Sequence, residues 1–494
     1  MTAQHGSATA ADDHYDLLVI GAGQGGGPLA GAFARAGRRV ALVERVHIGG
    51  TCINEGCSPT KTVIASARVA HMVARSPDYG VHPGGPAADG VHVDLARVRA
   101  RKQQIVDSFR TGSERALDSA GVVVLRAQAR FLAPRTVEVS PARASGRDEP
   151  LGGRRTLTAS RIVINTGLRP AIPDVPGLDG VPYLTSTSIL ELTEAPEHLI
   201  VLGGGYVGLE FAQAFRRFGS RVTIVQRDAQ LLPREDLDIA EAVTDILRAN
   251  GIDVLLSADV ERVNREKDAV RLTWCTRSRE REDTSGRGAE RDTVGSHLLV
   301  ATGRVPNTQD LGLDAAGVET DGRGFIRVNA RLETSVPEVY AVGDVKGGPA
   351  FTHISYDDFR ILRTNLLEGG SATTDRRLVP YTVFIDPQLG AIGITEREAR
   401  ATGRRIGIAK LPMTSVARAL EVDETRGFMK AIVDQDTKEI LGARVLGIEG
   451  GEIATLFQIA MMGKLPYTAL RDAVFSHPTL AEALNNLFMT MERE

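Results

Sequence analysis

The 494-residue chain carries 59 Lys and Arg residues against 62 Asp and Glu residues, so its formal net charge is only −3. This balance argues against nucleic acid or an anionic membrane as a main partner. No uninterrupted apolar run reaches the roughly 18 residues that a membrane-spanning helix needs. The 3 Cys are too few for a disulfide scaffold. The length allows about three domains, and we expect a cytoplasmic protein whose residues 1–13 form a disordered tail.

Residues 15–44 have the pattern of a strand–helix–strand unit. An apolar run at 16–20 predicts a buried parallel strand, an Ala-rich stretch at about 28–36 predicts a helix, and 39–43 predicts the next strand. The turn between the first strand and the helix carries a GxGxxG pattern formed by Gly21, Gly23 and Gly26. A flexible turn in a glycine-rich chain is the simplest alternative, but the position between a strand and a helix favours a dinucleotide site.

The three glycines and the residue that ends the second strand suit a dinucleotide for separate reasons. The first glycine permits a tight turn, the second lets the backbone approach a pyrophosphate, and the third lets the helix pack on the strand. The helix N-terminus then faces the phosphates. Glu44 follows the second strand and can hold the ribose hydroxyls of an adenosine.

A cysteine pair, Cys52 and Cys57, follows this unit in the segment GGTCINEGCSPTK. In a regular helix they would lie at least ~7.5 Å apart along the axis, and a disulfide needs Cα atoms nearer than about 7 Å. We therefore expect an irregular segment enabled by Gly56, with a helix from Thr60 onward that favours a thiolate at its N-terminus. A structural disulfide, a zinc site and two buried thiols are the alternatives. Cys275, in a strand-like stretch, is expected to be inert.

The strand–helix–strand pattern returns at residues 198–226. Strands are predicted at 198–202 and 221–225, and the helix between them stops at Gly219. The glycine positions of the second turn are Gly203, Gly205 and Gly208.

The second strand of this unit ends without an acid. Gln226 and Arg227 stand there, and Arg234 lies downstream. The 2′-hydroxyl of NADH loses its usual partner, whereas two Arg could pair with a 2′-phosphate. The site therefore favours NADPH over NADH, unless both Arg are only solvated surface residues.

Two polar stretches, 140–160 and 276–293, are expected to be surface excursions, with 280–291 mobile.

These features, in this order, resemble the class I pyridine nucleotide-disulfide oxidoreductases, which include dihydrolipoamide dehydrogenase, glutathione and mycothione reductases, and mercuric reductase. The resemblance runs from about residue 15 to residue 488. It implies an α/β fold with two Rossmann-like domains, for FAD and NAD(P), and a C-terminal α+β dimerisation domain. The implied boundaries are 14–168 and 299–374 for FAD, 169–298 for NAD(P) and 375–494 for dimerisation.

The resemblance also implies roles for single residues. The implied FAD-binding residues are Gly21, Gly23, Gly26, Glu44, Gly50, Thr51, Thr166, Gly167, Gly343 and Asp344. The implied NAD(P)-binding residues are Gly203, Gly205, Tyr206, Gly208, Gln226, Arg227, Arg234 and Gly303. Tyr206 resembles an aromatic lid over the flavin, with a core aromatic as the alternative. The implied catalytic residues are Cys52, Cys57, Lys61, Glu210, His477 and Glu482, and no metal site is implied.

The implied reaction passes electrons from NAD(P)H to FAD, to the Cys52–Cys57 disulfide and on to a small disulfide substrate. Cys57 resembles the thiol next to the flavin, and Cys52 the thiol that attacks the substrate. In this family His477, held by Glu482, comes from the opposite subunit, which implies a homodimer. Reduction of metal ions or quinones through the cysteine relay, dithiol oxidation with NAD(P)+, and a scaffold role are the alternatives.

Three features depart from the family pattern. Glu55 and Ser58 stand where relatives usually carry apolar residues, and a carboxylate near Cys52 would oppose thiolate formation. Mercuric reductases carry a C-terminal Cys pair and tend to lack the His at position 477. This sequence has that His and no such pair, which makes Hg(II) a doubtful physiological substrate.

Overall fold

The computed structural model describes residues 13–82, 91–141, 153–276, 289–375 and 377–492. The described chain divides into two compact units. The first unit comprises the described residues within 13–59, 103–169 and 304–377, and the second comprises those within 60–102, 170–303 and 378–492. The predicted tail, except Asp13, and residues 280–288 of the predicted mobile stretch lie outside the described residues.

A parallel sheet forms the centre of the first unit, with its strands in the order β3, β2, β1, β5, β15. Their bounds are β1 His14–Ile20, β2 Val40–Glu44, β3 Val123–Ala133, β5 Arg155–Ile164 and β15 Val339–Ala341. The outer parts of β3 and β5 continue beyond this sheet and pair antiparallel with β4 (Thr136–Pro141). The predicted order of strand, glycine turn, helix and strand is confirmed.

Both faces of β1 are buried, which explains its continuous apolar run. Leu17 and Val19 pack with residues of two helices, α1 (Gly26–Arg35) and α8 (Thr352–Leu367). Leu18 and Ile20 point into a separate core on the other face. Neighbouring side chains of a strand point to opposite faces, so a strand covered on both sides has no polar side. The remaining helices that include first-unit residues are α2 (Gly50–Asn54), α3 (Cys57–Arg75), α4 (Leu95–Ser119) and α7 (Leu313–Ala316).

The second unit contains another parallel sheet, in the order β13, β7, β8, β9. Its strands are β7 His198–Leu202, β8 Arg221–Val225, β9 Asp253–Leu255 and β13 His297–Val300. Helices α5 (Tyr206–Arg217) and α6 (Leu237–Ala249) bury apolar residues in the same core as this sheet. The antiparallel strands that follow are β10 Ala258–Glu266, β11 Ala269–Thr276 and β12 Arg291–Gly295. Strands β6 (Leu168–Pro170) and β14 (Arg304–Pro306) pair with each other, and except for Pro170 they belong to the first unit.

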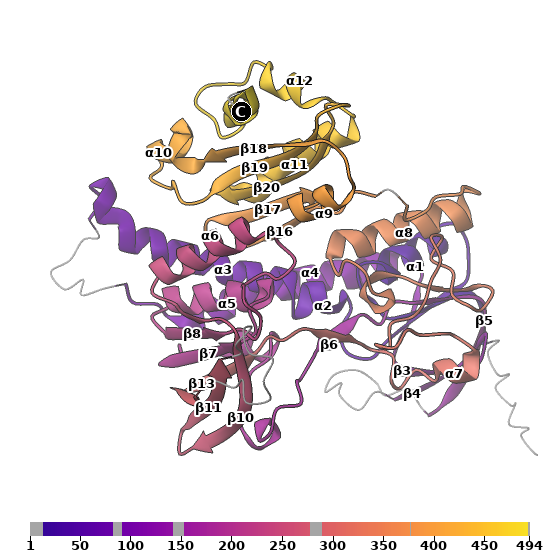
Figure 1. Ribbon diagram of the computed structural model, residues 1–494. Helices are drawn as coiled ribbons and strands as arrows, with labels where there is room; N and C mark the ends of the chain where they lie inside the picture. Colours follow the sequence, from indigo (N-terminus) through magenta and orange to yellow (C-terminus); the bar gives the residue numbers. More distant parts are fainter. Residues whose placement is uncertain (1–12, 83–90, 142–152, 277–288, 376, 493–494) are drawn as a thin grey trace, which may run out of the picture. The chain divides into compact units, whose positions relative to one another are not determined.

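The C-terminal part of the second unit is an antiparallel five-stranded sheet in the order β16, β17, β20, β19, β18 (Figure 1). The strands are β16 Tyr381–Val383, β17 Gln388–Gly393, β18 Ile406–Pro412, β19 Phe428–Asp434 and β20 Ile440–Gly447. The helices are α9 Glu396–Ala401, α10 Ala417–Glu421, α11 Gly450–Met462, α12 Tyr467–Arg471 and α13 Ala483–Met489. Phe457 of α11 and Phe488 of α13 meet edge to face in its core. Short 3₁₀ turns lie at Ser76–Tyr79, Leu178–Gly180, Ser188–Glu191, Gly343–Lys346, Met413–Ser415 and Thr490–Glu492.

The predicted α/β class, with two strand–helix–strand units and a C-terminal α+β region, is confirmed. Two details were wrong. The stretches 140–160 and 276–293 are not wholly excursions, because β5 and β12 occupy much of their described parts. The helix after the cysteine pair begins at Cys57 rather than at Thr60. Within the described residues, no helix has both the length and the apolar character required to span a bilayer.

Candidate active site

The first glycine-rich turn has no room for side chains. Gly21 has φ +102°, and a Cβ atom there would lie 2.4 Å from the carbonyl oxygen of Asn165. A Cβ atom on Gly26 would lie 2.4 Å from the carbonyl oxygen of Gly21. One on Gly23 would lie 2.8 Å from Oδ1 of Asn165. These contacts bring the N-terminus of α1 against the end of β1, as a pyrophosphate site requires.

Asn165, which the sequence reasoning did not single out, fastens this turn. Its Oδ1 accepts a 2.8 Å hydrogen bond from the backbone N–H of Gly26. Its Nδ2 donates to the carbonyl oxygen of Val342, 2.9 Å away. The buried Asn165 side chain therefore joins the turn to the segment that follows β15. Its position at the end of β5, directly before Thr166, was the available signal.

The strand-end residues Glu44 and Gln226 make the same contact in the two strand–helix–strand units. Oε2 of Glu44 accepts from the backbone N–H of Ala22 at 2.9 Å, and its Oε1 accepts from Val46 at 2.9 Å. Oε1 of Gln226 accepts from the backbone N–H of Gly204, also at 2.9 Å. Both side chains thus hold the glycine turn that precedes their own strand.

The cysteine segment is anchored on the first glycine turn. The backbone N–H of Gly49 donates to the carbonyl oxygen of Ala22 at 3.0 Å. Gly50 has φ +63°, and a Cβ atom there would lie 2.7 Å from the Cα atom of Gly23. Helix α2, which begins at Gly50, carries Thr51 and Cys52. The segment is therefore built directly onto the turn that would hold a dinucleotide.

Cys52 and Cys57 lie on two different helices, so the expected break between them is confirmed. Cys52 is partly buried within α2, whereas Cys57 is exposed and is the first residue of α3. At the break, a Cβ atom on Gly56 would lie 2.9 Å from the carbonyl oxygen of Thr51. Sγ of Cys57 and Oγ1 of Thr352, the first residue of α8, form a 3.4 Å hydrogen bond.

Gly343, a predicted FAD-binding residue, contacts a buried carboxylate, Asp358, that the sequence reasoning missed. Asp358 accepts from the backbone N–H of Gly343 at 2.8 Å and forms ion pairs with Lys346 and Arg377. Asp344 forms an ion pair with Arg304 at 3.4 Å. Burial raises the pKa of Asp344, although Arg304 and Lys346 oppose this shift.

Asn307 holds Thr166 and Gly167, two of the predicted FAD-binding residues, in place. The Asn307 side chain donates to the carbonyl oxygen of Thr166 at 2.9 Å, and its backbone N–H donates to Gly167 at 3.0 Å. Among the described residues, the buried Oγ1 of Thr166 has no hydrogen-bond partner. Gly303, a predicted NAD(P)-binding residue, has φ +135° and open space where a Cβ atom would lie.

In the second unit, the structure brings Lys61 and Glu210 together. Nζ of Lys61 lies 2.7 Å from Oε2 of Glu210, which is almost fully buried. Oε1 of Glu210 accepts from the backbone N–H of Phe384 at 2.9 Å. The Lys61 ammonium also lies 4.8 Å from the centre of the Phe384 ring. The carboxylate is thus fixed by a cation and a backbone donor.

The second glycine turn repeats the geometry of the first. Gly203 has φ +115°, and a Cβ atom there would lie 2.5 Å from the carbonyl oxygen of Ala301. A Cβ atom on Gly208 would lie 2.5 Å from the carbonyl oxygen of Gly203. Gly205 has open space at this position. Tyr206 begins α5 and is 38% exposed, so it is not a core aromatic.

Two predicted nucleotide residues, Arg227 and Arg234, are exposed. Arg227 has a neighbouring acid that the sequence reasoning did not weigh. Oδ1 of Asp228 lies 3.7 Å from Nε of Arg227, and its Oδ2 accepts from the Gln226 side chain at 3.2 Å. This region therefore presents two guanidinium groups and one carboxylate.

His477 and Glu482 form the predicted histidine–carboxylate pair. Nδ1 of His477 lies 2.9 Å from Oε2 of Glu482. The His477 side chain is exposed, and a carboxylate on one ring nitrogen of a histidine fixes the tautomer of the ring. Oγ1 of Thr479 accepts from the backbone N–H of Glu482 at 3.2 Å and donates to the carbonyl oxygen of Ser476 at 2.8 Å. No group of three or more potential metal ligands occurs among the described residues.

Comparison with known proteins identifies the family. The model of pyridine nucleotide-disulphide oxidoreductases matches residues 15–358, and the model of their dimerisation domain matches residues 379–488. The chain therefore belongs to the pyridine nucleotide-disulfide oxidoreductase family. It is an FAD-dependent oxidoreductase of the type in which electrons pass from NAD(P)H through FAD to a disulfide.

Individual relatives cover almost the whole chain. A probable pyridine nucleotide-disulfide oxidoreductase of Escherichia coli K12, RclA, is 38% identical over 96% of this chain and 98% of its own length. A mercuric reductase of Streptomyces lividans is 34% identical, over 95% of this chain and 94% of the relative. A dihydrolipoyl dehydrogenase of Haloferax volcanii is 33% identical, with the same coverage.

The solved structure of RclA, described as an HOCl-induced flavoprotein disulfide reductase from Escherichia coli, has the same fold. It matches with a TM-score of 0.83 and 37% identity, over 96% of this chain and 99% of that chain. A Cu(II) complex of the same E. coli protein matches with a TM-score of 0.82.

Proposed function

We propose that this protein is a cytoplasmic, homodimeric, NADPH-dependent reductase of a small disulfide, with Cys52 and Cys57 as its redox-active pair. The observation that carries the proposal is the setting of Cys57. It is the first residue of the long helix α3, and its sulfur is hydrogen-bonded to Thr352. A helix N-terminus and a hydroxyl donor both favour a thiolate.

The residues of the first unit fit FAD. The close packing at Gly21 and Gly26 brings the N-terminus of α1 against the end of β1, and a pyrophosphate could bind at that helix N-terminus. The buried Thr166 hydroxyl still needs a hydrogen-bond partner among the described residues, which a bound polar group would supply. Glu44 would hold the adenosine ribose, and Asp344 would bind the ribityl or pyrophosphate region. When bound, FAD would supply the two-electron link between a nicotinamide and a disulfide.

The two thiols would divide the exchange reaction between them. The Cys52 thiolate attacks one sulfur of the substrate, the substrate S–S bond breaks, and one substrate thiolate leaves. The Cys57 thiolate then attacks the Cys52 sulfur, which releases the second substrate thiolate and forms the Cys52–Cys57 disulfide. His477 of the partner subunit would donate a proton to the leaving sulfur, with Glu482 fixing the imidazole orientation.

The second glycine turn would bind the pyridine nucleotide. Arg227 and Arg234 are exposed and could pair with a 2′-phosphate, so we propose NADPH rather than NADH. Asp228 could instead accept a hydrogen bond from the 2′-hydroxyl of NADH. Because Asp228 contacts Arg227, the preference between NADPH and NADH depends on the balance between this carboxylate and the two guanidinium groups. Replacement of Arg227 by Ala should therefore raise the KM for NADPH and leave that for NADH nearly unchanged.

A homodimer is supported by apolar residues on the surface of the C-terminal region. Ile459 and Met462 of α11, and Val474 beyond α12, are large hydrophobic side chains that the single chain leaves exposed. Their region lies within the match to the dimerisation-domain model. A second copy would cover such residues, as apolar groups in obligate interfaces are covered.

A second candidate function is metal-ion reduction through the cysteine relay. Mercuric reductases are among the relatives, and RclA has been solved as a Cu(II) complex. A metal ion has no leaving thiolate, so this route does not need the proton of His477. Dithiol oxidation with NAD(P)+ would use the same residues in reverse.

The test is nucleotide oxidation by the purified holoenzyme across a panel of acceptors: glutathione disulfide, mycothione, lipoamide, Hg(II), Cu(II) and a quinone, each with NADPH and with NADH. We expect fast turnover with a disulfide, lost in the His477→Ala variant. Cys275→Ser is the matched control, because Cys275 lies buried in β11 against Glu261 and should not affect turnover. Turnover confined to metal ions or quinones, and unchanged by His477→Ala, would refute disulfide reduction.

A further inference from the structure

The connection from β8 to α6, residues 226–236, is attached to the second glycine turn at its N-terminal end. The backbone N–H of Gly204 donates to Gln226 at 2.9 Å, and its carbonyl oxygen accepts from the backbone N–H of Leu232 at 3.0 Å. A Cβ atom on Gly204 would lie 2.7 Å from Cδ2 of Leu231. Gly204 is thus held by this connection on both sides, and any shift of the connection moves the glycine turn.

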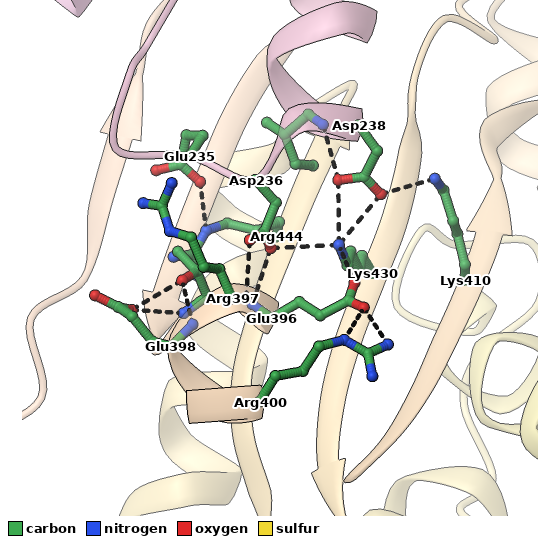
Figure 2. Close-up of polar contacts among 12 residues, drawn as sticks. Glu235, Asp236, Asp238, Glu396, Arg397, Glu398, Arg400, Lys410, Lys430 and Arg444 are labelled. Carbon is green, nitrogen blue, oxygen red and sulfur yellow. Dashed lines mark hydrogen bonds and ion pairs between the residues drawn. The ribbon is translucent and has the colours of Figure 1, made fainter. Parts of the chain in front are cut away.

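The other end of this connection is attached to the C-terminal sheet by two buried cations (Figure 2). Arg444 of β20, 3% exposed, lies 2.7 Å from Glu235, which is also buried. Lys430 of β19, 2% exposed, lies 3.3 Å from Asp236. Glu235 further accepts a hydrogen bond from the hydroxyl of Tyr381. Glu235 and Asp236, the last two residues of the connection, therefore lie in a buried cluster of charged residues rather than at the surface.

Helix α9 adds backbone donors to the same acids. Asp236 accepts from the backbone N–H groups of Glu396 at 2.9 Å and Arg397 at 3.1 Å. Burial alone would raise the pKa of Asp236, but these N–H groups and Lys430 hold it below its ordinary value. The Arg397 side chain donates to the carbonyl oxygen of Arg234 at 3.3 Å. The backbone of Arg234, which is predicted to pair with a 2′-phosphate, is therefore held in place as well.

Lys430 is the centre of the cluster, while Lys410 stands at its margin. Besides Asp236, Nζ of Lys430 contacts Glu396 at 2.7 Å and Asp238 at 3.1 Å (Figure 2). Lys410 contacts Asp238 at 2.8 Å but is 44% exposed. A buried ion pair has a defined geometry that solvent does not replace, whereas an exposed pair contributes little.

We infer that Arg444 and Lys430 are positioning residues for the pyridine-nucleotide site. They hold residues 226–236 in the conformation that presents Arg227, Arg234 and the Gly204 backbone to the nucleotide. The C-terminal sheet thereby sets the affinity of the site for the adenosine end of the nucleotide. This inference rests on the proposed function of the second glycine turn.

The experiment measures binding of NADP+ and of 2′-phospho-ADP-ribose to the holoenzyme by calorimetry. We expect Arg444→Met and Lys430→Met to raise both dissociation constants roughly tenfold, because the binding-competent connection would be only about one-tenth populated. At saturating NADPH, kcat should stay within about twofold of wild type, since the reacting groups are untouched. Lys410→Met is the matched control and should change neither quantity.

Arg397→Ala provides a variant that keeps every buried charge. Arg397 is exposed, so its loss should preserve the fold and still weaken NADP+ binding about threefold by releasing the Arg234 backbone. The unfolding temperature shows whether Arg444→Met and Lys430→Met are folded. If they are not, NADP+ binding by Arg397→Ala alone tests the inference. Unchanged NADP+ binding in all folded variants would overturn the inference.

Direct variants distinguish this failure from failure of the proposed function. Arg227→Ala and Arg234→Ala remove the groups proposed to contact the 2′-phosphate. If these two weaken NADP+ binding and the positioning variants do not, only the positioning role is refuted. If neither set weakens NADP+ binding, the nucleotide site proposed here is wrong, and the inference is wrong with it.

Discussion

The pair formed by Lys61 and Glu210 offers a sharp prediction, because one partner is buried and the other is not. Glu210 is 2% exposed and Lys61 is 32% exposed, with 2.7 Å between their charged atoms. Replacing Lys61 by Met removes the cation but keeps most of the side-chain volume. The Glu210 carboxylate would then remain buried with the backbone N–H of Phe384 as its donor.

The size of the effect follows from the burial of the carboxylate. Breaking a buried ion pair by removing one partner costs about 3–5 kcal/mol. Since Lys61 is partly open to solvent, we take the lower end, about 3 kcal/mol. That loss corresponds to a roughly hundredfold larger population of the locally opened state around Glu210. In the Lys61→Met/Glu210→Gln double variant, a neutral amide can still accept from Phe384, and most of the loss should be recovered.

The assay is hydrogen exchange, measured by mass spectrometry, of peptides that contain α5 and Phe384. Lys102→Met is a suitable control, because Lys102 pairs with the exposed Glu191 and should not alter exchange in α5. The reasoning is refuted if Lys61→Met leaves exchange in these peptides unchanged. It is also refuted if the double variant exchanges as fast as the single one.

Three further predictions follow from single contacts. Thr352→Val removes the hydroxyl next to Cys57 and should slow iodoacetamide alkylation of the reduced enzyme about fivefold at neutral pH; an unchanged rate would contradict the contact. Asn165→Ala leaves two buried backbone groups without partners and should weaken FAD retention at least about tenfold, measured by flavin fluorescence release; wild-type retention would refute it. Burial, reinforced by Arg217, lowers the pKa of His71 to about 4, so the unfolded chain binds the extra proton first. The contribution of His71 to the free energy of unfolding is therefore fully present above about pH 6.5. As the pH drops toward 4, the free energy of unfolding should fall by about 1–2 kcal/mol, a value already reduced for solvent screening. His71→Gln should flatten this dependence of the unfolding temperature, and an identical slope would refute it.

The two glycine turns could be predicted from the sequence because the backbone conformation of such a turn depends on residues that are neighbours in the sequence. A tight turn between a strand and a helix needs left-handed backbone, which Gly21 and Gly203 adopt. Asn165 was not found because its partner, Gly26, lies far away in the sequence. The same limit applies to Lys430 and Arg444, whose acids lie about 200 residues earlier and meet them only after the sheets have formed.

Two local predictions were wrong, at the polar starts of β5 and β12 and at the start of helix α3. The strands β5 and β12 begin with polar residues, and polar stretches without periodicity predict a loop. The helix was expected to start only at Thr60, because the segment that carries Cys52 and Cys57 was expected to be irregular. Pro59 lies in the first turn of α3, where a missing N–H costs no hydrogen bond.

The most direct test of thiol exchange at Cys52 is anaerobic, with NADPH and the disulfide identified from the acceptor panel. In the Cys52→Ser variant, NADPH should still bleach the flavin absorbance, because Cys57 and the nucleotide site are intact. Disulfide-dependent NADPH oxidation should fall at least about a thousandfold, as expected for loss of a nucleophile. Turnover by Cys52→Ser at the wild-type rate would contradict the account, because another group would then have to attack the substrate.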